Sequence, residues 1–320
     1  MPIVSFRLIS SLIFLVALPC YLTANAQPKK ELNFNPCELS TLDGRGMLSA
    51  LCADWKQPID PGDAKSTQID LFVVKVSSAS PNPKPDPLLI INGGPGGSSV
   101  DLLVDLAGAN VFRRILNKRD VIVMDQRGTG RSSSLACPAL ADNQLQITDT
   151  DIKLLTKECL GQLNYDPRYF STTHAVQDIE SLRIALGKDQ LNVYGVSYGT
   201  RVAMEYARRF EQSTRTLILD GVVPPTIALG PGVATKSQEA LDLVFEQCRE
   251  SVPCNDAFPS LDEKFWDLMT RLEKHPVNTK FQDPRSGDPI EVEVEKEHLA
   301  LVVRMSLYNP ELRSLLPYLI

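Results

Sequence analysis

Runs of apolar residues alternate with amphipathic segments over most of the chain. Short apolar runs typical of strands buried on both faces of a sheet lie at 88–91, 120–124, 191–196 and 216–219. Segments with apolar residues at helical spacing lie between them, at 100–116, at 172–186 and after Gly199. Strands that alternate with helices in this way predict a mostly parallel sheet with helices on both faces, an α/β fold.

The two flanks of this alternating region have different patterns. Residues 68–76 alternate apolar and polar positions, which predicts an antiparallel strand at the N-terminal edge of the sheet. After Pro224 helical periodicity dominates, with one alternating strand; the predicted elements are 238–249, 262–274, 290–294, 297–307 and 311–320. We therefore expect a core at 27–223 and a mainly helical cap, itself incomplete, at 224–320.

The first 26 residues have the pattern of a secretory signal. Arg7 precedes an apolar run from Leu8 to Leu18, and Ala24-Asn25-Ala26 matches a signal peptidase site. This predicts a secreted or periplasmic protein, with no membrane association after removal of residues 1–26.

Six cysteines follow the predicted signal, an even number that favours disulfides in an oxidising compartment. Sequential pairing closes three short loops: Cys37 with Cys52, Cys137 with Cys159, and Cys248 with Cys254. Metal binding is the alternative, but the sequence has no C-x-x-C pair and no Cys/His cluster, so we expect no metal site. The formal net charge is −6 and no basic run is present, which disfavours a nucleic-acid partner.

Gly195-Val196-Ser197-Tyr198-Gly199 lies between an apolar strand and a helix-forming segment. This is the G-x-S-x-G pattern of a nucleophile elbow, a sharp turn that raises the serine hydroxyl above the sheet. Side chains at 195 and 199 would collide with the neighbouring strand and helix, and the following helix directs its positive N-terminal end towards the site. We therefore expect Ser197 to be a catalytic nucleophile.

A glycine-rich loop, Asn92-Gly93-Gly94-Pro95-Gly96-Gly97, follows the first buried strand. Its backbone N–H groups could face a ligand because few side chains shield them. A phosphate loop is disfavoured, since neither Gly-Lys-Ser/Thr nor G-x-G-x-x-G spacing occurs here. A turn that only reverses the chain is the other alternative.

Asp125 and Arg127 follow the second buried strand, where we expect them to hold the turn rather than react. An aspartate there can accept turn N–H bonds, and an arginine can pair with a carboxylate or carbonyl. His174 lies in the first turn of the helix predicted at 172–186, where capping or solvent contacts account for it.

Three motifs in this order, Asn92-Gly-Gly-Pro-Gly-Gly-Ser, Asp125-Gln-Arg-Gly-Thr-Gly-Arg-Ser and Gly195-Val-Ser-Tyr-Gly-Thr, resemble those of the prolyl aminopeptidase and secreted tripeptidyl aminopeptidase family of α/β-hydrolases. The resemblance implies an α/β-hydrolase fold with a helical cap after the strand that follows the elbow. It also implies an oxyanion hole from the backbone N–H groups of Gly94 and Tyr198. The implied activity is removal of residues or short peptides from free N-termini, without a cofactor.

The family places its catalytic acid and histidine after the cap, whereas this chain ends inside the segment that resembles the cap. We therefore expect the C-terminal part of the core to be missing and the chain shown to be inactive. His174, His275 and His298 lack the expected setting of the base, and Asp220 is a weaker candidate for the acid.

Three acidic residues at helical spacing in the cap, Glu239, Asp242 and Glu246, are candidates for binding a substrate amino group, although a solvated helix face explains them as well. The expected partner is a peptide or small ester substrate. A carboxylesterase-like hydrolase shares the elbow and remains an alternative. A non-catalytic remnant of the fold is another.

Overall fold

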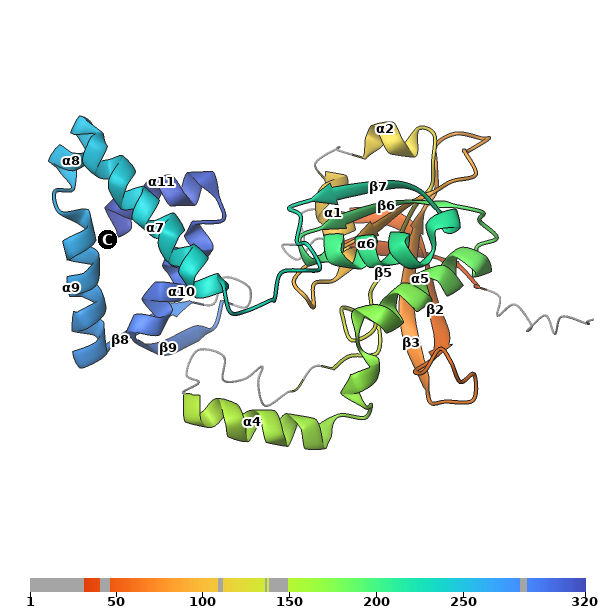
Figure 1. Cartoon of the computed structure of the whole chain (residues 1–320), viewed down its shortest axis with the longest axis horizontal. Helices are drawn as coiled ribbons and strands as arrows, with labels where there is room; N and C mark the ends of the chain where they lie inside the picture. The colour runs from red at the N-terminus through yellow and green to blue at the C-terminus, as the bar shows by residue number, and fades with distance from the viewer. Residues whose placement is uncertain (1–31, 41–46, 109–111, 136, 138–148, 283–286) are drawn as a thin grey trace, which may run out of the picture. The chain divides into compact units, whose positions relative to one another are not determined.

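The structure is a computed structural model that describes residues 32–40, 47–108, 112–135, 137, 149–282 and 287–320 (Figure 1). The predicted signal at 1–26 lies outside these residues.

A seven-stranded sheet, in the order β1-β2-β3-β5-β4-β6-β7, forms the centre of the core (Figure 1). Its strands are β1 (Asn35–Ser40), β2 (Met47–Pro58), β3 (Gln68–Val76), β4 (Leu88–Ile91), β5 (Val121–Met124), β6 (Leu191–Val196) and β7 (Thr214–Asp220). β1, β2, β3 and β5 pair antiparallel in succession, and β5, β4, β6 and β7 pair parallel. The predicted parallel sheet with an antiparallel N-terminal edge is confirmed.

Helices cover both faces of this sheet. They are α1 (Ser99–Gly108), α2 (Arg113–Leu116), α5 (Thr172–Ala185) and α6 (Tyr198–Arg209), with α4 (Asp149–Gln162) before α5. Val176 and Ile179 of α5 and Val202 of α6 belong to one buried apolar cluster with side chains of the sheet. Val100 and Leu103 of α1 belong to a second cluster, with the side chains that alternate strand positions send to the other face. Every residue of β4 and β5 is buried, as their uninterrupted apolar sequence predicts.

β7 is the outer strand of the described sheet, and Leu217 and Ile218 on it are exposed. An apolar run there predicts a strand correctly, but the structure does not bury it.

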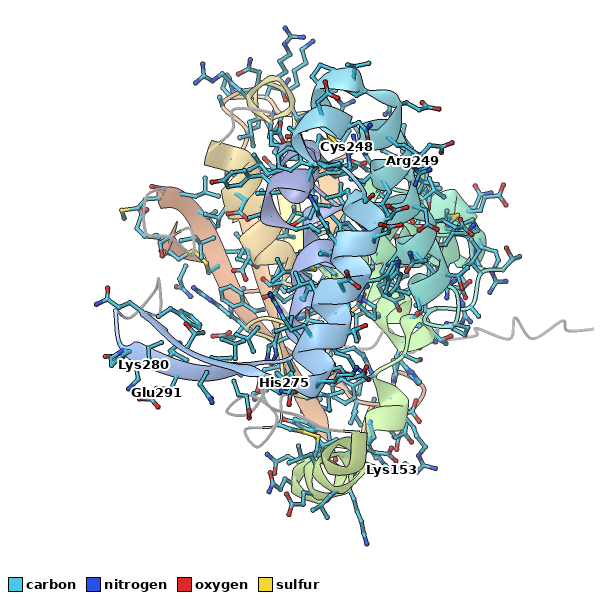
Figure 2. The ribbon with its side chains drawn as sticks, turned by 90° about the vertical axis from the view of Figure 1, so that its left-hand side faces the viewer. Lys153, Cys248, Arg249, His275, Lys280 and Glu291 are labelled. Carbon is cyan, nitrogen blue, oxygen red and sulfur yellow. A yellow bond between two sulfur atoms is a disulfide. The ribbon has the colours of Figure 1, made fainter. Side chains whose placement is uncertain are left out.

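The region after residue 232 has an apolar core of its own, formed by residues such as Leu241, Phe265 and Val303. Its elements are α7 (Val233–Glu250), α8 (Val252–Ala257), α9 (Leu261–Lys274), β8 (Val277–Gln282), β9 (Pro289–Val294), α10 (Lys296–Ser306) and α11 (Pro310–Leu319). The hairpin β8–β9 carries a cross-strand ion pair between Lys280 and Glu291 (Figure 2).

The three predicted disulfides are present: Cys37–Cys52, Cys137–Cys159 and Cys248–Cys254. The first joins neighbouring strands β1 and β2, and the last joins α7 to α8. Among the described residues, no helix is both long and apolar enough to cross a membrane.

One boundary differs from the sequence-based prediction. The segment predicted as one helix at 100–116 contains α1, which ends at Gly108, and α2, which begins at Arg113; residues 109–111 lie outside the described residues. α5 begins at Thr172 as predicted, and Ser171, the last residue with extended backbone angles, is its N-cap.

Candidate active site

Ser197 occupies the sharp turn between β6 and α6. Its backbone has φ 53° and ψ −122°, a conformation that side-chain-bearing residues rarely adopt, and its side chain is exposed. A strained, solvent-accessible serine at this point has the geometry of the nucleophile elbow that the sequence predicts.

The two glycines of the elbow are required by contact. A Cβ on Gly195 would lie 2.4 Å from the carbonyl oxygen of Gly199, at the start of α6. A Cβ on Gly199 would lie 2.3 Å from the carbonyl oxygen of Ile91, at the end of β4. Strand and helix can therefore meet at this angle only when both positions lack a side chain, which confirms the predicted steric reason.

The glycine-rich loop after β4 lies directly against the serine. A Cβ on Gly93 would meet Ser197 Cβ at 2.7 Å and Oγ at 3.2 Å, so the loop backbone is within reach of the hydroxyl. Asn92 braces the loop: its Nδ2 donates to the Ser98 carbonyl at 2.7 Å, and its Oδ1 accepts the Gly93 N–H at 2.7 Å. Asn92 and Gly93 therefore support the site, and sequence reasoning had assigned neither of them a role.

The backbone N–H groups of Gly94 and Tyr198 donate no hydrogen bond within the described part of the chain. Tyr198 is the first residue of α6, where N–H groups lack a partner inside the helix and the helix dipole is positive. The described hydrogen bonds therefore leave both amides unused, and their role as oxyanion donors stays a prediction.

Asp125 holds the loop after β5 from a fully buried position. Its Oδ1 accepts the Ser98 hydroxyl at 2.9 Å and the Val100 N–H at 3.1 Å, and its Oδ2 accepts the Arg131 N–H at 2.9 Å. Burial raises the pKa of the Asp125 carboxyl, while these hydrogen bonds oppose the rise. The predicted turn-holding contacts are confirmed.

Arg127 connects the same loop to α5. Its Nε and Nη2 each donate to the Asp178 carboxylate at 2.7 Å, and its Nη1 donates to the carbonyls of Ile59 and Tyr169. Both charged side chains are almost fully buried. The arginine thus pairs with a carboxylate and carbonyls, as the sequence predicts.

None of the three histidines hydrogen-bonds Ser197 in the described residues. His174 Nδ1 lies 2.8 Å from the Ser171 hydroxyl, a first-turn contact, and burial and the Arg127 charge lower its pKa. His298 Nδ1 accepts the Glu295 N–H in a capping box at the start of α10. His275 is the C-cap residue that follows α9 (Figure 2).

Asp220, the weaker candidate for the acid, ends β7 next to the elbow. Its carbonyl accepts the Ser197 N–H at 2.7 Å, and its carboxylate accepts the Tyr194 hydroxyl at 2.8 Å. Its carboxylate therefore pairs with a phenol, and its backbone holds the elbow.

The three acidic candidates of the helical region, Glu239, Asp242 and Glu246, are all exposed on α7. Lys236 pairs with Glu239 at 2.6 Å, and Gln238 donates to Asp242 at 2.8 Å. These contacts are typical of a solvated helix face, and a role of the three residues in substrate binding stays a prediction.

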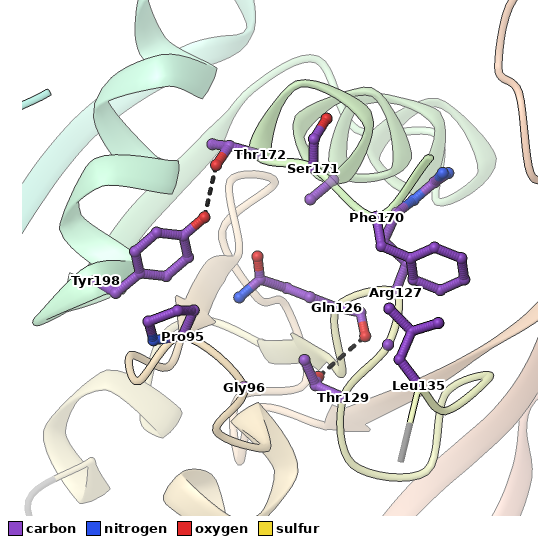
Figure 3. Close-up of a pocket in the computed structure, with 12 residues that line it drawn as sticks. Pro95, Gly96, Gln126, Arg127, Thr129, Leu135, Phe170, Ser171, Thr172 and Tyr198 are labelled. Carbon is purple, nitrogen blue, oxygen red and sulfur yellow. Dashed lines mark hydrogen bonds between the residues drawn. The ribbon is translucent and has the colours of Figure 1, made fainter. Parts of the chain in front are cut away.

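A pocket of about 240 Å³ lies beside the elbow (Figure 3). It is lined by Pro95, Gly96, Gln126, Arg127, Gly128, Thr129, Leu135, Phe170, Ser171, Thr172, Ala175 and Tyr198. The hydroxyls of Thr172 and Tyr198 hydrogen-bond each other at 2.6 Å on its wall, and the Gln126 side chain extends into it (Figure 3). Sequence reasoning quoted Gln126 within its motif but gave it no role.

No group of three or more His, Cys, Asp or Glu side chains suited to a metal ion occurs among the residues described.

Comparison with known proteins links this geometry to a family. A family model described as "alpha/beta hydrolase fold" matches residues 86–250. The chain is 25% identical over 314 residues to serine protease Hip1 of Mycobacterium tuberculosis (strain ATCC 25618 / H37Rv), covering 90% of this chain and 59% of that protein.

Two further relatives have peptidase names. Tripeptidyl aminopeptidase of Streptomyces lividans is 26% identical over 53% of this chain and 34% of its own length. Proline iminopeptidase of Xylella fastidiosa (strain Temecula1 / ATCC 700964) is 30% identical over 44% of this chain and 34% of its own length. The chain spans less than two thirds of each of these curated relatives, and the resemblance stated from the motifs is confirmed.

Proposed function

Because the chain belongs to the α/β hydrolase fold family, we propose that it is a secreted serine hydrolase with Ser197 as nucleophile. The observation that carries the proposal is the exposed Ser197 at φ 53°, with the loop backbone at Gly93 against it. The three disulfides support an oxidising compartment and hence secretion or export to a periplasm.

The proposed reaction is acyl transfer from a peptide with a free N-terminus, since the relatives are named as peptidases. Ser197 Oγ bonds to the carbonyl carbon, and a base takes its proton. The Gly94 and Tyr198 amides bind the oxyanion, each contributing about 3 kcal/mol to lowering the barrier. The C–N bond then breaks, the amine leaves with the proton, and water hydrolyses the ester.

We also propose the division into a core at 27–223 and a helical cap at 224–320, whose acidic face would receive the substrate's amino group. Among the described residues no histidine hydrogen-bonds Ser197, so we propose none of the three as the base. A serine without its base reacts slowly, so we expect the chain alone to be nearly inactive.

A fluorophosphonate probe tests this proposal. We expect mass spectrometry to find the label on Ser197, weakly in this chain and strongly in the product of its complete reading frame. Ser197→Ala should remove it from both products. Labelling that persists in Ser197→Ala, or that is absent from both products, would contradict the proposal and favour a non-catalytic protein.

Parallel assays separate peptidase from esterase activity. We expect release of a reporter amine from peptides with a free amino terminus, and little release once that terminus is acetylated. Preference for short acyl esters over these peptides would instead indicate a carboxylesterase.

A further inference from the structure

Gln126 is a largely buried residue whose side-chain amide has no hydrogen-bond partner among the described residues. The residue is 8% exposed, and its amide makes no hydrogen bond in the described part of the chain. The amide is not among the fully enclosed polar atoms without a partner, so it reaches solvent through the pocket, where a ligand group could replace the water that it contacts. Figure 3 shows the Gln126 side chain directed into the pocket between Pro95 and Ser171.

The main chain of Gln126 holds the turn. Its carbonyl accepts the Thr129 N–H and hydroxyl, both at 3.0 Å, which fixes the backbone from which the side chain extends. The residues on either side, Asp125 and Arg127, are themselves buried and bonded. The backbone that carries the amide is therefore fixed, while the amide itself makes no hydrogen bond in the described residues.

The pocket suits one uncharged group. Pro95, Leu135, Phe170 and Ala175 give it apolar walls, and its volume of about 240 Å³ is below the usual 300–1,000 Å³ of a drug-sized ligand site. Arg127 also borders it, but the Asp178 carboxylate neutralises that charge. Among the described lining residues no carboxylate is present to attract a cation.

The pocket also adjoins the proposed oxyanion donors. Tyr198 lines it, and Pro95 directly follows Gly94. A group that fills the pocket is therefore attached close to the carbonyl carbon that Ser197 would attack.

We propose that this pocket binds a neutral amide group of the peptide substrate and that Gln126 is its specificity-determining residue. The proposal rests on the proposed function. An amide both donates and accepts, so a glutamine can form two hydrogen bonds with another amide at once. That amide belongs either to the side chain of the residue that supplies the scissile carbonyl or to the main chain just before it.

Equilibrium binding of short peptides tests this without turnover. Ser197→Ala protein is titrated calorimetrically with tripeptides that carry glutamine, leucine or lysine at the residue before the scissile bond. A fourth peptide, N-methylated at the main-chain amide of that residue, separates the two sources. We expect Gln126→Leu to weaken binding of the preferred peptide about tenfold, the value of one or two lost hydrogen bonds.

Two further variants make the result specific. Gln126→Glu keeps the shape of the side chain and adds a charge, so it should shift preference towards the lysine peptide. Gln212→Leu makes the same chemical change at an exposed position and should leave binding unchanged. Circular dichroism confirms that each variant is folded.

The outcomes distinguish the two proposals. Binding to the Ser197→Ala protein that Gln126→Leu and Gln126→Glu leave unchanged, or no binding of any of the peptides, overturns the assignment of Gln126. Binding that depends on Gln126 without fluorophosphonate labelling of Ser197 in either product supports the subsite and overturns the hydrolase.

Discussion

Three positions around Ser197 have no room for even a single methyl group in place of the glycine hydrogen. Gly195 and Gly199 each face a backbone carbonyl that a Cβ would overlap, and Gly93 faces the serine itself. The G-x-S-x-G pattern predicts the first two, because the elbow geometry is known to need them. The role of Gly93 could not be predicted, because it depends on where a loop 104 residues earlier in the chain returns in space.

Gly199→Ala tests the elbow contact. Its Cβ would lie 2.3 Å from the Ile91 carbonyl oxygen, so β4 and α6 must separate. We expect the free energy of unfolding to fall by about 1–3 kcal/mol, measured by urea denaturation. Gly161→Ala in α4 is the control, since no heavy atom lies within 4 Å there and alanine favours a helix. Equal losses in both variants would exclude the contact as the cause.

Tyr194 provides a pH-dependent readout next to the elbow. Burial, together with the hydrogen bond to Asp220 and its charge, raises the pKa of Tyr194 to about 12. An unfolded tyrosine loses its proton near pH 10, so this contribution to stability is complete below about 10 and is lost as the pH rises to about 12.

Asp220→Asn should lower the pKa of Tyr194 towards its ordinary value without reaching it, because the burial remains. The tyrosinate absorbance in an alkaline titration measures the change, with Tyr194→Phe to identify the signal. An unchanged pKa would show that the Asp220 carboxylate does not hold this phenol.

At the scale of elements, apolar periodicity predicts the bounds of those helices and strands that bury an apolar face. β3, β4, β6, α5 and α9 begin and end within one or two residues of the prediction, because each has an uninterrupted pattern. β8 was missed, since all its residues are exposed and no buried face imposes alternation. α8 was missed as well; it spans only six residues and follows α7 after Ser251.

The candidate site could be predicted only in part. Ser197 and its two glycines belong to a local pattern, whereas Gln126 lines a pocket whose walls come from four separate segments. Sequence spacing cannot show that a side chain lines a pocket formed by segments far apart in the chain.

The Arg127–Asp178 pair connects the loop after β5 to α5, and its removal should be costly. Asp178→Asn leaves a buried guanidinium without its counter-charge, for which we expect a loss of about 3–5 kcal/mol in the free energy of unfolding. Glu239→Gln breaks the exposed pair with Lys236 and should cost less than about 1 kcal/mol. Chemical denaturation compares the two, and similar losses would contradict a structural role for the buried pair.

At the scale of the whole molecule, the three disulfides are each local. Cys37–Cys52 closes a loop of 15 residues and Cys248–Cys254 one of 6, so neither joins distant parts of the chain. The sheet and the helical region therefore depend on their apolar cores for long-range order.

Replacing each cysteine pair by alanine tests this. Chain entropy predicts a loss of about 3 kcal/mol for Cys37–Cys52 and about 2 kcal/mol for Cys248–Cys254. Thermal and urea unfolding measure both losses. A much larger loss for either pair would mean that the disulfide stabilises structure beyond the loop that it closes.

The contact between Gly93 and Ser197 also matters for laboratory evolution of this protein. In a library randomised at position 93, any side chain would collide with Ser197 and displace it. Loss of activity in such clones would therefore result from a displaced backbone and would say nothing about the new side chain's chemistry. Screens for altered substrate choice should therefore leave this position fixed and diversify the pocket wall beyond it.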